Sequence, residues 1–530
     1  MTRSDPYPVK AKASVRRGTF SVNVIAQVLS FSIFIGIGVL LTPYLIHRLG
    51  PAHYGLIPLA LTLISYCGVL TVAINTSVSR SLTQAVERDD DANVNLIFST
   101  SVVVCLVIAC VVSLFLAGAA VFLDKLIQIP ENGLYQARWL FGTTALSFVV
   151  STVMTPFSVA AFCRNRFEIT HAIAIIGNVV RVAGIVLFFG LFEPSIKWVG
   201  VAGLTSVATA ALLHVIAWRH LMPGTTICFP NVQWSTFKHL FFTGVWVSVF
   251  QVGTILLLSV DLVLINHFFG PTSGGRYAAI LQWSAMLRNF ATSLAAVFTP
   301  TILGLHAKGD LDEVKLYALR AARFVGYSMS IPIGILCGMA ADILDVWLGE
   351  DFTDLVPLMV ILIGPLSINL GVLPLFAVSL AADKIKIPGL LTIGFGIMNV
   401  LLGVILVTQT TLGIYGVAIS GVAVLTLKNV IFTPMWAAHN IDRPLRTFLL
   451  PLLGLLLATT ALAGVTWVAC QAMLIDTWFR ILSVASCLSV LYSAAVYFLV
   501  MDAEDRKFVS DKLAKIGAKM GFEKAWANIT

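Results

Sequence analysis

Charged side chains are scarce in this sequence. Of 530 residues, 34 are Lys or Arg and 26 are Asp or Glu, so charged residues make up 11% of the chain, against about 25% in ordinary soluble proteins. This scarcity excludes a soluble globular enzyme. Hydrophobic residues reach 58%, more than one water-solvated core can bury, and only a lipid bilayer can solvate the excess. The sequence therefore predicts a polytopic membrane protein.

Patterns typical of metal sites are also missing. The eight cysteines form no CxxC pair, and no histidine stands at a zinc-site spacing from them. We therefore expect no metal and no resident cofactor. The predicted external loops are short and hold no cluster of histidines and carboxylates, which argues against a membrane enzyme that acts on a glycolipid.

Long apolar runs, in contrast, are abundant. A helix needs about 20 mostly apolar residues to cross the hydrocarbon, and about fourteen runs approach that length. They are too long and too continuous for barrel strands of roughly 10 alternating residues, so we expect an all-α polytopic bundle. The expected spans cover residues 20–45, 54–79, 96–123, 139–161, 170–192, 198–217, 240–265, 277–300, 324–348, 355–380, 389–408, 413–435, 448–470 and 481–501.

Basic residues are distributed unevenly between the two sides of these spans. With an even number of spans, both termini lie on one side, and 25 of the 34 Lys and Arg residues lie there, against six in the opposite loops. Cytoplasmic loops carry the excess of positive charge, so both termini are predicted to be cytoplasmic. The net charge of +8 is then a topological signal, and no nucleic-acid partner is expected.

The two halves of the chain show matching landmarks about 220 residues apart. The Gly-Pro pair at 50–51 follows span one, and the pair at 270–271 follows span seven; Asp90 and Asp310 lie in loops at the same offset. One Gly-Pro pair is generic turn chemistry, but several landmarks in register indicate an internal repeat. Two further pairs at nearly this spacing are Arg164 with Lys384 and Pro156 with Pro374.

This repeat predicts a domain organisation. Residues 1–222 and 235–440 would form two six-helix lobes of the same orientation, related by an axis along the membrane normal, as in alternating-access transporters. Two additional helices would follow at 445–501. The tail at 502–530 is basic and amphipathic, and we expect it to lie along the anionic inner leaflet.

Three short motifs resemble one transporter family. They are the sequence LGPAHYG at 49–55, Asp261 followed by an apolar run to Gly270, and the Gly-x-x-Gly-x-Ala step at 413–418. The chain, from about residue 20 to 500, resembles the lipid-linked oligosaccharide flippases of the polysaccharide transport (O-antigen flippase, Wzx-like) family, which are related to the lipid II flippase MurJ and to MATE exporters.

The resemblance implies a cavity between two lobes and a location in the bacterial inner (plasma) membrane. It implies that the cargo is a polyprenyl-diphosphate-linked oligosaccharide, moved by alternating access for surface polysaccharide biosynthesis. Membrane lipids, a polysaccharide polymerase and chain-length proteins would be partners.

Ionisable residues within the spans are the candidate functional groups, because each costs roughly 2.5 to 3.5 kcal/mol at a helix centre. Asp342 and Asp345 lie toward the external end of their span, where a structural or interfacial role is favoured. The others are Arg181, Asp261, Arg288 and Lys428.

Arg288 and Asp261 lie on consecutive spans and are expected to approach each other. A guanidinium matches phosphate oxygens in a plane and stays charged, so Arg288 would bind the diphosphate or an acidic sugar. Asp261 would couple transport to H⁺ or Na⁺, being protonated or ion-bound in one state. The alternative is a buried Arg-Asp pair that fixes helix register without touching substrate.

Four further residues are weaker candidates for substrate binding. Arg181 would contact substrate or else satisfy helix carbonyls. Lys428 would contact substrate or else extend toward the cytoplasmic surface. Arg80 and Asn75 lie near the cytoplasmic mouth, where Arg80 meets an incoming diphosphate or is an ordinary positive-inside anchor.

Two other functions remain open at this point. A MATE-like exporter of organic cations would need carboxylates in its cavity, yet spans one and two contain no Asp or Glu. A non-transporting scaffold would leave a charged Arg288 near the membrane midplane without a role.

Overall fold

The computed structural model describes residues 17–88, 90–131, 133–164, 166–226, 248–384, 386–473 and 476–501, together with Glu504, Arg506 and Ser510. Helices and their connections make up this described part, which contains no strand. Twelve of its helical stretches are long and apolar enough to cross a membrane. The predicted all-α polytopic fold is thereby confirmed, whereas nearly all of the expected amphipathic tail and the connection before residue 248 lie outside the described residues.

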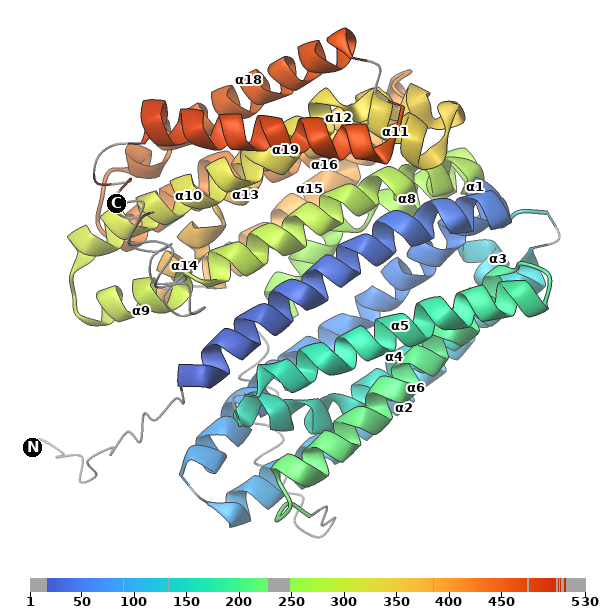
Figure 1. Cartoon of the computed structure of the whole chain (residues 1–530). Coiled ribbons are helices and arrows are strands. Elements are labelled where there is room, and N and C mark those ends of the chain that lie inside the picture. Colours follow the sequence, from blue (N-terminus) through green and yellow to red (C-terminus); the bar gives the residue numbers. More distant parts are fainter. Residues whose placement is uncertain are drawn as a thin grey trace, which may run out of the picture.

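The first half of the chain forms one bundle, drawn in blue and green in Figure 1. In it, α4 packs against α2 and α6, and α1 packs against α2, α4 and α5. Its helices are α1 (Arg17–Glu87), α2 (Asp91–Val121), α3 (Leu123–Leu126), α4 (Leu134–Cys163), α5 (Phe167–Leu191) and α6 (Ile196–Leu221).

The second half forms another bundle, and α18 and α19 pack on its outer side against α10 (Figure 1). The visible end of α19 lies at the same end of the molecule as the start of α1 (Figure 1). The elements are a helix at 248–258, α8 (Asp261–Ala296), α9 (Thr299–Ala307), α10 (Leu311–Gly338), α11 (Ala340–Leu348), η2 (Glu350–Leu355), α12 (Val356–Ile363), α13 (Leu366–Gly371), α14 (Leu373–Ala381), α15 (Lys386–Gln409), α16 (Ile414–Thr426), the π-helical η3 (Leu427–Phe432), α17 (Thr433–Asn440), η4 (Leu445–Phe448), α18 (Leu450–Ala472), α19 (Trp478–Ala495) and the π-helical η5 (Val496–Val500).

Two of the twelve stretches each contain a turn. Gly50 has φ 77° and ψ 158°, and Gly270 has φ 83° and ψ 175°, so α1 and α8 are each interrupted there. A positive φ strains residues with a Cβ, and the following proline suits the first position of a new helix. The predicted number of fourteen spans treats each of these two stretches as two spans, and it stays a prediction. The orientation of the termini stays a prediction.

The N-terminal caps of two helices also match at the offset of the internal repeat. A carboxylate oxygen of Asp90 accepts a hydrogen bond from the backbone N–H of Asn93 at 3.1 Å, and Asp310 accepts one from Glu313 at 3.1 Å. Each aspartate thus satisfies one of the free N–H groups of a first turn, α2 or α10. The hydrogen bonds from the backbone and side chain of Asn93 hold the pKa of Asp90 below its usual value.

The Pro156 and Pro374 landmarks behave differently from each other. Helix α4 continues through Pro156. Span ten, in contrast, is interrupted at Gly364-Pro365 and again at Val372, so that it consists of α12, α13 and α14. The two repeats therefore diverge in the shape of their fourth spans.

The two bundles cross closely beside the Gly50 and Gly270 turns, a region that we call the turn end. A Cβ on Gly275 would lie 1.8 Å from the carbonyl oxygen of Pro51, and a Cβ on Gly55 would lie 3.1 Å from that of Pro271. These two contacts are equivalent under an offset of 220 residues. The bundles therefore meet here in a pseudo-two-fold arrangement that depends on the absence of a side chain at both glycines.

Hydrogen bonds add to this contact between the bundles. The backbone N–H of Gln128 donates to Asn266 Oδ1 at 2.9 Å, and Asn266 Nδ2 donates to the Gln128 carbonyl at 3.1 Å. The Trp347 indole donates to the Val39 carbonyl at 2.6 Å. That carbonyl lacks its usual helical donor because Pro43, four residues on, has no N–H. These hydrogen bonds thus join side chains of the second bundle to backbone groups of the first.

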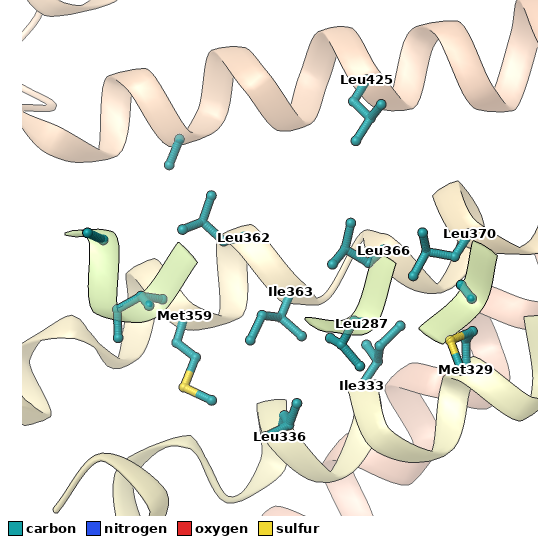
Figure 2. Packing of buried hydrophobic residues seen from close by; sticks show 14 of the residues in the cluster. Leu287, Met329, Ile333, Leu336, Met359, Leu362, Ile363, Leu366, Leu370 and Leu425 are labelled. Carbon is teal, nitrogen blue, oxygen red and sulfur yellow. The ribbon is translucent and has the colours of Figure 1, made fainter. Parts of the chain in front are cut away.

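The apolar core of the second bundle surrounds α8 (Figure 2). Leu287 of α8, Ile333 of α10, Ile363 of α12 and Leu366 of α13 are each at most 6% exposed. Figure 2 shows their side chains gathered between these helices, with Leu425 of α16 opposite. Close packing of this kind resists displacement, so α8 is held firmly at the position of the next residue, Arg288.

Candidate functional site

Span seven is broken just before Asp261. Its first helix ends at Leu258, Ser259 and Val260 form a turn, and α8 begins at Asp261. A break leaves helix carbonyls without intrahelical donors, and such groups need other partners within a membrane. Interrupted helices are also where transporters commonly bind ions and substrates.

Side chains from two other spans bond the carbonyls of this break. The Asn399 amide of α15 donates to the carbonyls of Leu256 at 3.4 Å and Leu257 at 3.3 Å. The Tyr66 hydroxyl of α1, in the other bundle, donates to the Ser259 carbonyl at 3.5 Å. The interrupted helix is therefore linked to both bundles.

Asp261 is buried beside this break, with 6% of its surface exposed. The Tyr277 hydroxyl donates to its Oδ2 at 3.2 Å, while Oδ1 has no hydrogen-bond partner among the described residues. A Cβ on Gly421 of α16 would lie 3.3 Å from Oδ2 and 3.8 Å from Asn399 Oδ1. The carboxylate and the Asn399 oxygen thus both lie beside a backbone position that has no side chain.

Ser420 completes this group of oxygens. Its hydroxyl donates to Asn399 Oδ1 at 3.0 Å and is fully buried. No set of three or more His, Cys, Asp or Glu side chains gathers within the described ranges in the way a metal site requires. A single carboxylate surrounded by neutral oxygens suits a proton or a monovalent cation better than a transition metal.

Arg288 lies on the same helix, α8, and its charge acts on Asp261 and Tyr277. Within the described residues, neither a hydrogen bond nor an ion pair within 4 Å joins Arg288 to Asp261, and the Arg288 Nε is buried without a hydrogen-bond partner. A buried donor without a partner costs about 1 to 3 kcal/mol. An anion bound here would supply the acceptor that this Nε–H lacks.

The structure does not bring the other candidate substrate-binding residues together with Asp261 and Arg288. Arg181 lies on α5 of the first bundle, and its Nε is buried without a partner in the described part of the chain. Lys428 lies in the π-helical η3, where its Nζ donates to Asn429 Oδ1 at 3.3 Å. Arg80 is exposed on α1, and Asn75 lines a cavity of the first bundle.

The two aspartates expected near the external surface lie on α11. Asp345 is exposed, and Asp342 is half-buried, where its charge acts on Cys470. Neither contacts the group around Asp261 among the interactions that the structure describes.

Three residues of the site escaped the sequence reasoning. Asn399, Ser420 and Tyr277 are uncharged, so a search for charges within spans passes over them. A usable signal was present, because Asn399 is a strongly polar side chain within the apolar run 389–408. A buried amide requires hydrogen-bond partners, and the nearest unsatisfied groups are those of a broken helix.

Two pseudo-symmetric helical bundles, with an interrupted span that carries a buried carboxylate, define a polytopic membrane transporter. Residues 46–357 match a family described as polysaccharide biosynthesis protein. The uncharacterized membrane protein EpsK of Bacillus subtilis (strain 168) is 31% identical over 500 residues, covering 94% of this chain and 98% of EpsK. The chain therefore belongs to the polysaccharide biosynthesis protein family.

More distant relatives agree with this assignment. A putative O-antigen transporter of Shigella flexneri is 22% identical over 356 residues, covering 66% of this chain and 81% of that protein. The lipid II flippase MurJ in an inward closed conformation has a TM-score of 0.65 at 14% identity, covering 90% of this chain and 98% of MurJ.

An inward-facing MATE family multidrug transporter has a TM-score of 0.62 at 13% identity, covering 80% of this chain and 98% of its own. At these identities, the likenesses show a shared fold. The resemblance noted in the sequence is confirmed.

Proposed function

We propose that this protein moves a polyprenyl-diphosphate-linked oligosaccharide from the cytoplasmic to the outer leaflet of the bacterial inner (plasma) membrane. The observation that carries this proposal is the Arg288 guanidinium, held on a rigid helix with a buried Nε that lacks a partner. An anionic cargo would supply the missing acceptor. Membership of the polysaccharide biosynthesis family supports a saccharide attached to that anion.

Arg288 would bind the diphosphate through parallel hydrogen bonds. A guanidinium presents its donors in a plane that matches two phosphate oxygens, and it keeps its charge within the bilayer. Arg181 and Lys428 would contribute positive charge from α5 and η3 in another state of the cycle, and Arg80 would attract the substrate at the cytoplasmic mouth. The lipid tail would stay in the bilayer throughout.

Asp261 would couple this movement to a cation, H⁺ or Na⁺. A cation at the oxygens of Asp261, Asn399 and Ser420 would neutralise the carboxylate and weaken its attraction for Arg288. The guanidinium would then be freer to hold the diphosphate. Because Tyr66 of the first bundle bonds the Ser259 carbonyl two residues before Asp261, a change at the cation site would reach the contact between bundles.

Arg288→Ala tests the anion site. Two charge-assisted hydrogen bonds, each worth about 1.5 to 3 kcal/mol, correspond to a loss of roughly 10²- to 10⁴-fold in affinity for a polyprenyl diphosphate. Arg288→Lys should lose less, because the charge remains while the planar geometry is lost. Arg138→Ala, at a surface arginine of the other bundle, is the control.

The measurements are binding to the purified protein and flipping of a fluorescent lipid-linked saccharide in proteoliposomes. Wild-type binding and flipping by a correctly inserted Arg288→Ala protein would remove Arg288 from the mechanism. Imposed proton and sodium gradients, applied separately, identify the coupling ion, and Asp261→Asn should abolish the response to that gradient. If neither gradient changes the rate in the wild-type protein, Asp261 is not a coupling group.

A MATE-like exporter of organic cations is the alternative, favoured by the shared fold. Its cargo would need a carboxylate free of positive neighbours, whereas Arg288 acts on the buried Asp261. Efflux of organic cations from proteoliposomes, with no flipping of the lipid-linked saccharide, would favour this alternative.

A further inference from the structure

A cavity with a mixed polar and apolar lining lies in the first bundle, on the side away from the turn end. It has a volume of about 500 Å³ and opens between α1, α4, α5 and α6. Asn75 and Ser79 line it from the last part of α1, and Thr170 lines it from the first turn of α5. These positions lie close to the helix ends that the charge distribution assigns to the cytoplasm, so a substrate arriving from that side would reach the cavity first.

The lining of this cavity combines polar and apolar side chains and carries no fixed charge. Among its nine lining residues, none is Asp, Glu, Lys or Arg. A diphosphate would call for arginine or lysine, and an organic cation would call for a carboxylate or an aromatic cage. The volume is within the range of roughly 300 to 1,000 Å³ found for small-molecule sites. The lining therefore suits a neutral ligand that has both polar and apolar faces.

The polar groups of the lining can both donate and accept hydrogen bonds. Ser158 donates its hydroxyl proton to the Thr155 carbonyl at 2.7 Å, which leaves its oxygen lone pairs as acceptors. Asn75 and His214 also line the cavity, and both side chains offer donors as well as acceptors. A sugar hydroxyl donates one hydrogen bond and accepts two, so a mixed lining of this kind matches it.

Two aromatic rings form part of the same wall. Phe162 at the end of α4 and Phe167 at the start of α5 have ring centroids 5.6 Å apart at an interplanar angle of 86°. Phe162 is 48% exposed. The two rings therefore present surfaces in two directions, and an aromatic face packs well against the apolar C–H face of a pyranose.

We propose that this cavity binds a sugar residue of the transported glycolipid, at a place separate from the diphosphate. The inference rests on the proposed function, because it assumes a lipid-linked saccharide as cargo. With the diphosphate at Arg288 of the second bundle and a sugar at α4 to α6 of the first, one substrate molecule would contact both bundles. Its saccharide would then contribute to the choice of substrate, and its diphosphate to affinity shared by all polyprenyl diphosphates.

The test compares two probes on the purified full-length chain in nanodiscs. One is a synthetic polyprenyl diphosphate, and the other is the same lipid carrying a disaccharide. We expect the wild-type protein to bind the disaccharide form about tenfold more tightly, since one or two net hydrogen bonds have this effect. Thr170→Val and His214→Phe preserve shape while removing hydrogen-bonding groups, and each should reduce the tenfold preference to about twofold.

The bare lipid should bind these two variants as it binds the wild-type protein. Leu212→Ala is the control, because Leu212 lies on α6 two residues before His214, is 62% exposed and does not line the cavity. It should keep the tenfold preference. The two near-isosteric variants lie on different helices, so misfolding of one leaves the other to decide.

The outcomes separate this inference from the function on which it rests. If the wild-type protein binds both lipids equally, the sugar site is refuted while diphosphate binding stands. If the preference exists but both variants keep it, the sugar binds elsewhere and the inference is likewise overturned. If the wild-type protein binds neither lipid, the proposed function itself fails.

Discussion

Gly275→Ala should open the turn end. The added Cβ would lie 1.8 Å from the Pro51 carbonyl oxygen and 2.6 Å from its carbonyl carbon. Ordinary contact begins at about 3.4 Å, so the two helices would have to separate locally by about 1.6 Å. Both atoms belong to the backbone of Pro51, directly after the Gly50 turn, and no side-chain rotation can relieve the overlap.

The size of the expected shift toward an open turn end follows from the free-energy cost of overpacking, about 1 to 3 kcal/mol. Because this cost applies only while the bundles are in contact, it shifts the equilibrium between closed and open turn ends by about 5- to 150-fold toward the open state. Gly118→Ala is a matched control, since Gly118 lies within α2 and nothing surrounds its Cβ position within 4 Å. It makes the same chemical change without the overlap.

Spin labels at Tyr135→Cys and Glu350→Cys, in a background without the eight native cysteines, report the distance between the bundles. Both positions are exposed, one at the start of α4 and the other at the start of η2. Gly275→Ala should add a population at longer distance. A distance distribution identical to that of Gly118→Ala would refute the reasoning that this crossing holds the turn end closed.

Two further substitutions test contacts at the break in span seven and at the turn end. Asn399→Leu leaves the Leu256 and Leu257 carbonyls without their donor, which should cost about 1 to 3 kcal/mol. A lower Tm of the purified protein measures this, and an unchanged Tm contradicts the role of Asn399. Asn266→Leu removes both hydrogen bonds to the Gln128 backbone, at a similar cost. It should speed the reaction of a Val39→Cys thiol with a membrane-impermeant reagent added outside, and an unchanged rate would show that this pair does not control access.

The sequence was sufficient for the features that have their own local chemistry. The Gly-Pro turns could be predicted because a positive φ followed by proline leaves few choices of residue. Asp90 and Asp310 were recognised only as matching loop residues, and their role as N-caps is a finding of the structure. The break at Ser259-Val260 could not be predicted, because residues 254–265 include no glycine or proline that would mark it. It persists through Asn399 and Tyr66, which are distant in sequence, and a local pattern cannot reveal such partners.

The residues of the candidate site likewise divide into those that the sequence identifies and those that only the structure reveals. Arg288 and Asp261 stand out because a charge within a span is costly wherever it points. Asn399 and Ser420 acquire their role only when α15 and α16 pack beside α8. The sugar-sized cavity is made of residue types that are common in any membrane helix, so only their convergence from four helices distinguishes them.

The paired contacts of Pro51 with Gly275 and of Gly55 with Pro271 are those that a symmetric homodimer of six-helix subunits would make, each surface patch meeting a copy of itself. In such a dimer, every substitution occurs twice, and the crossing must tolerate both copies at once. In this single chain, the two copies are separate positions. The halves can therefore specialise, one toward an anion and a cation and the other toward a sugar, while the crossing still constrains both glycines together.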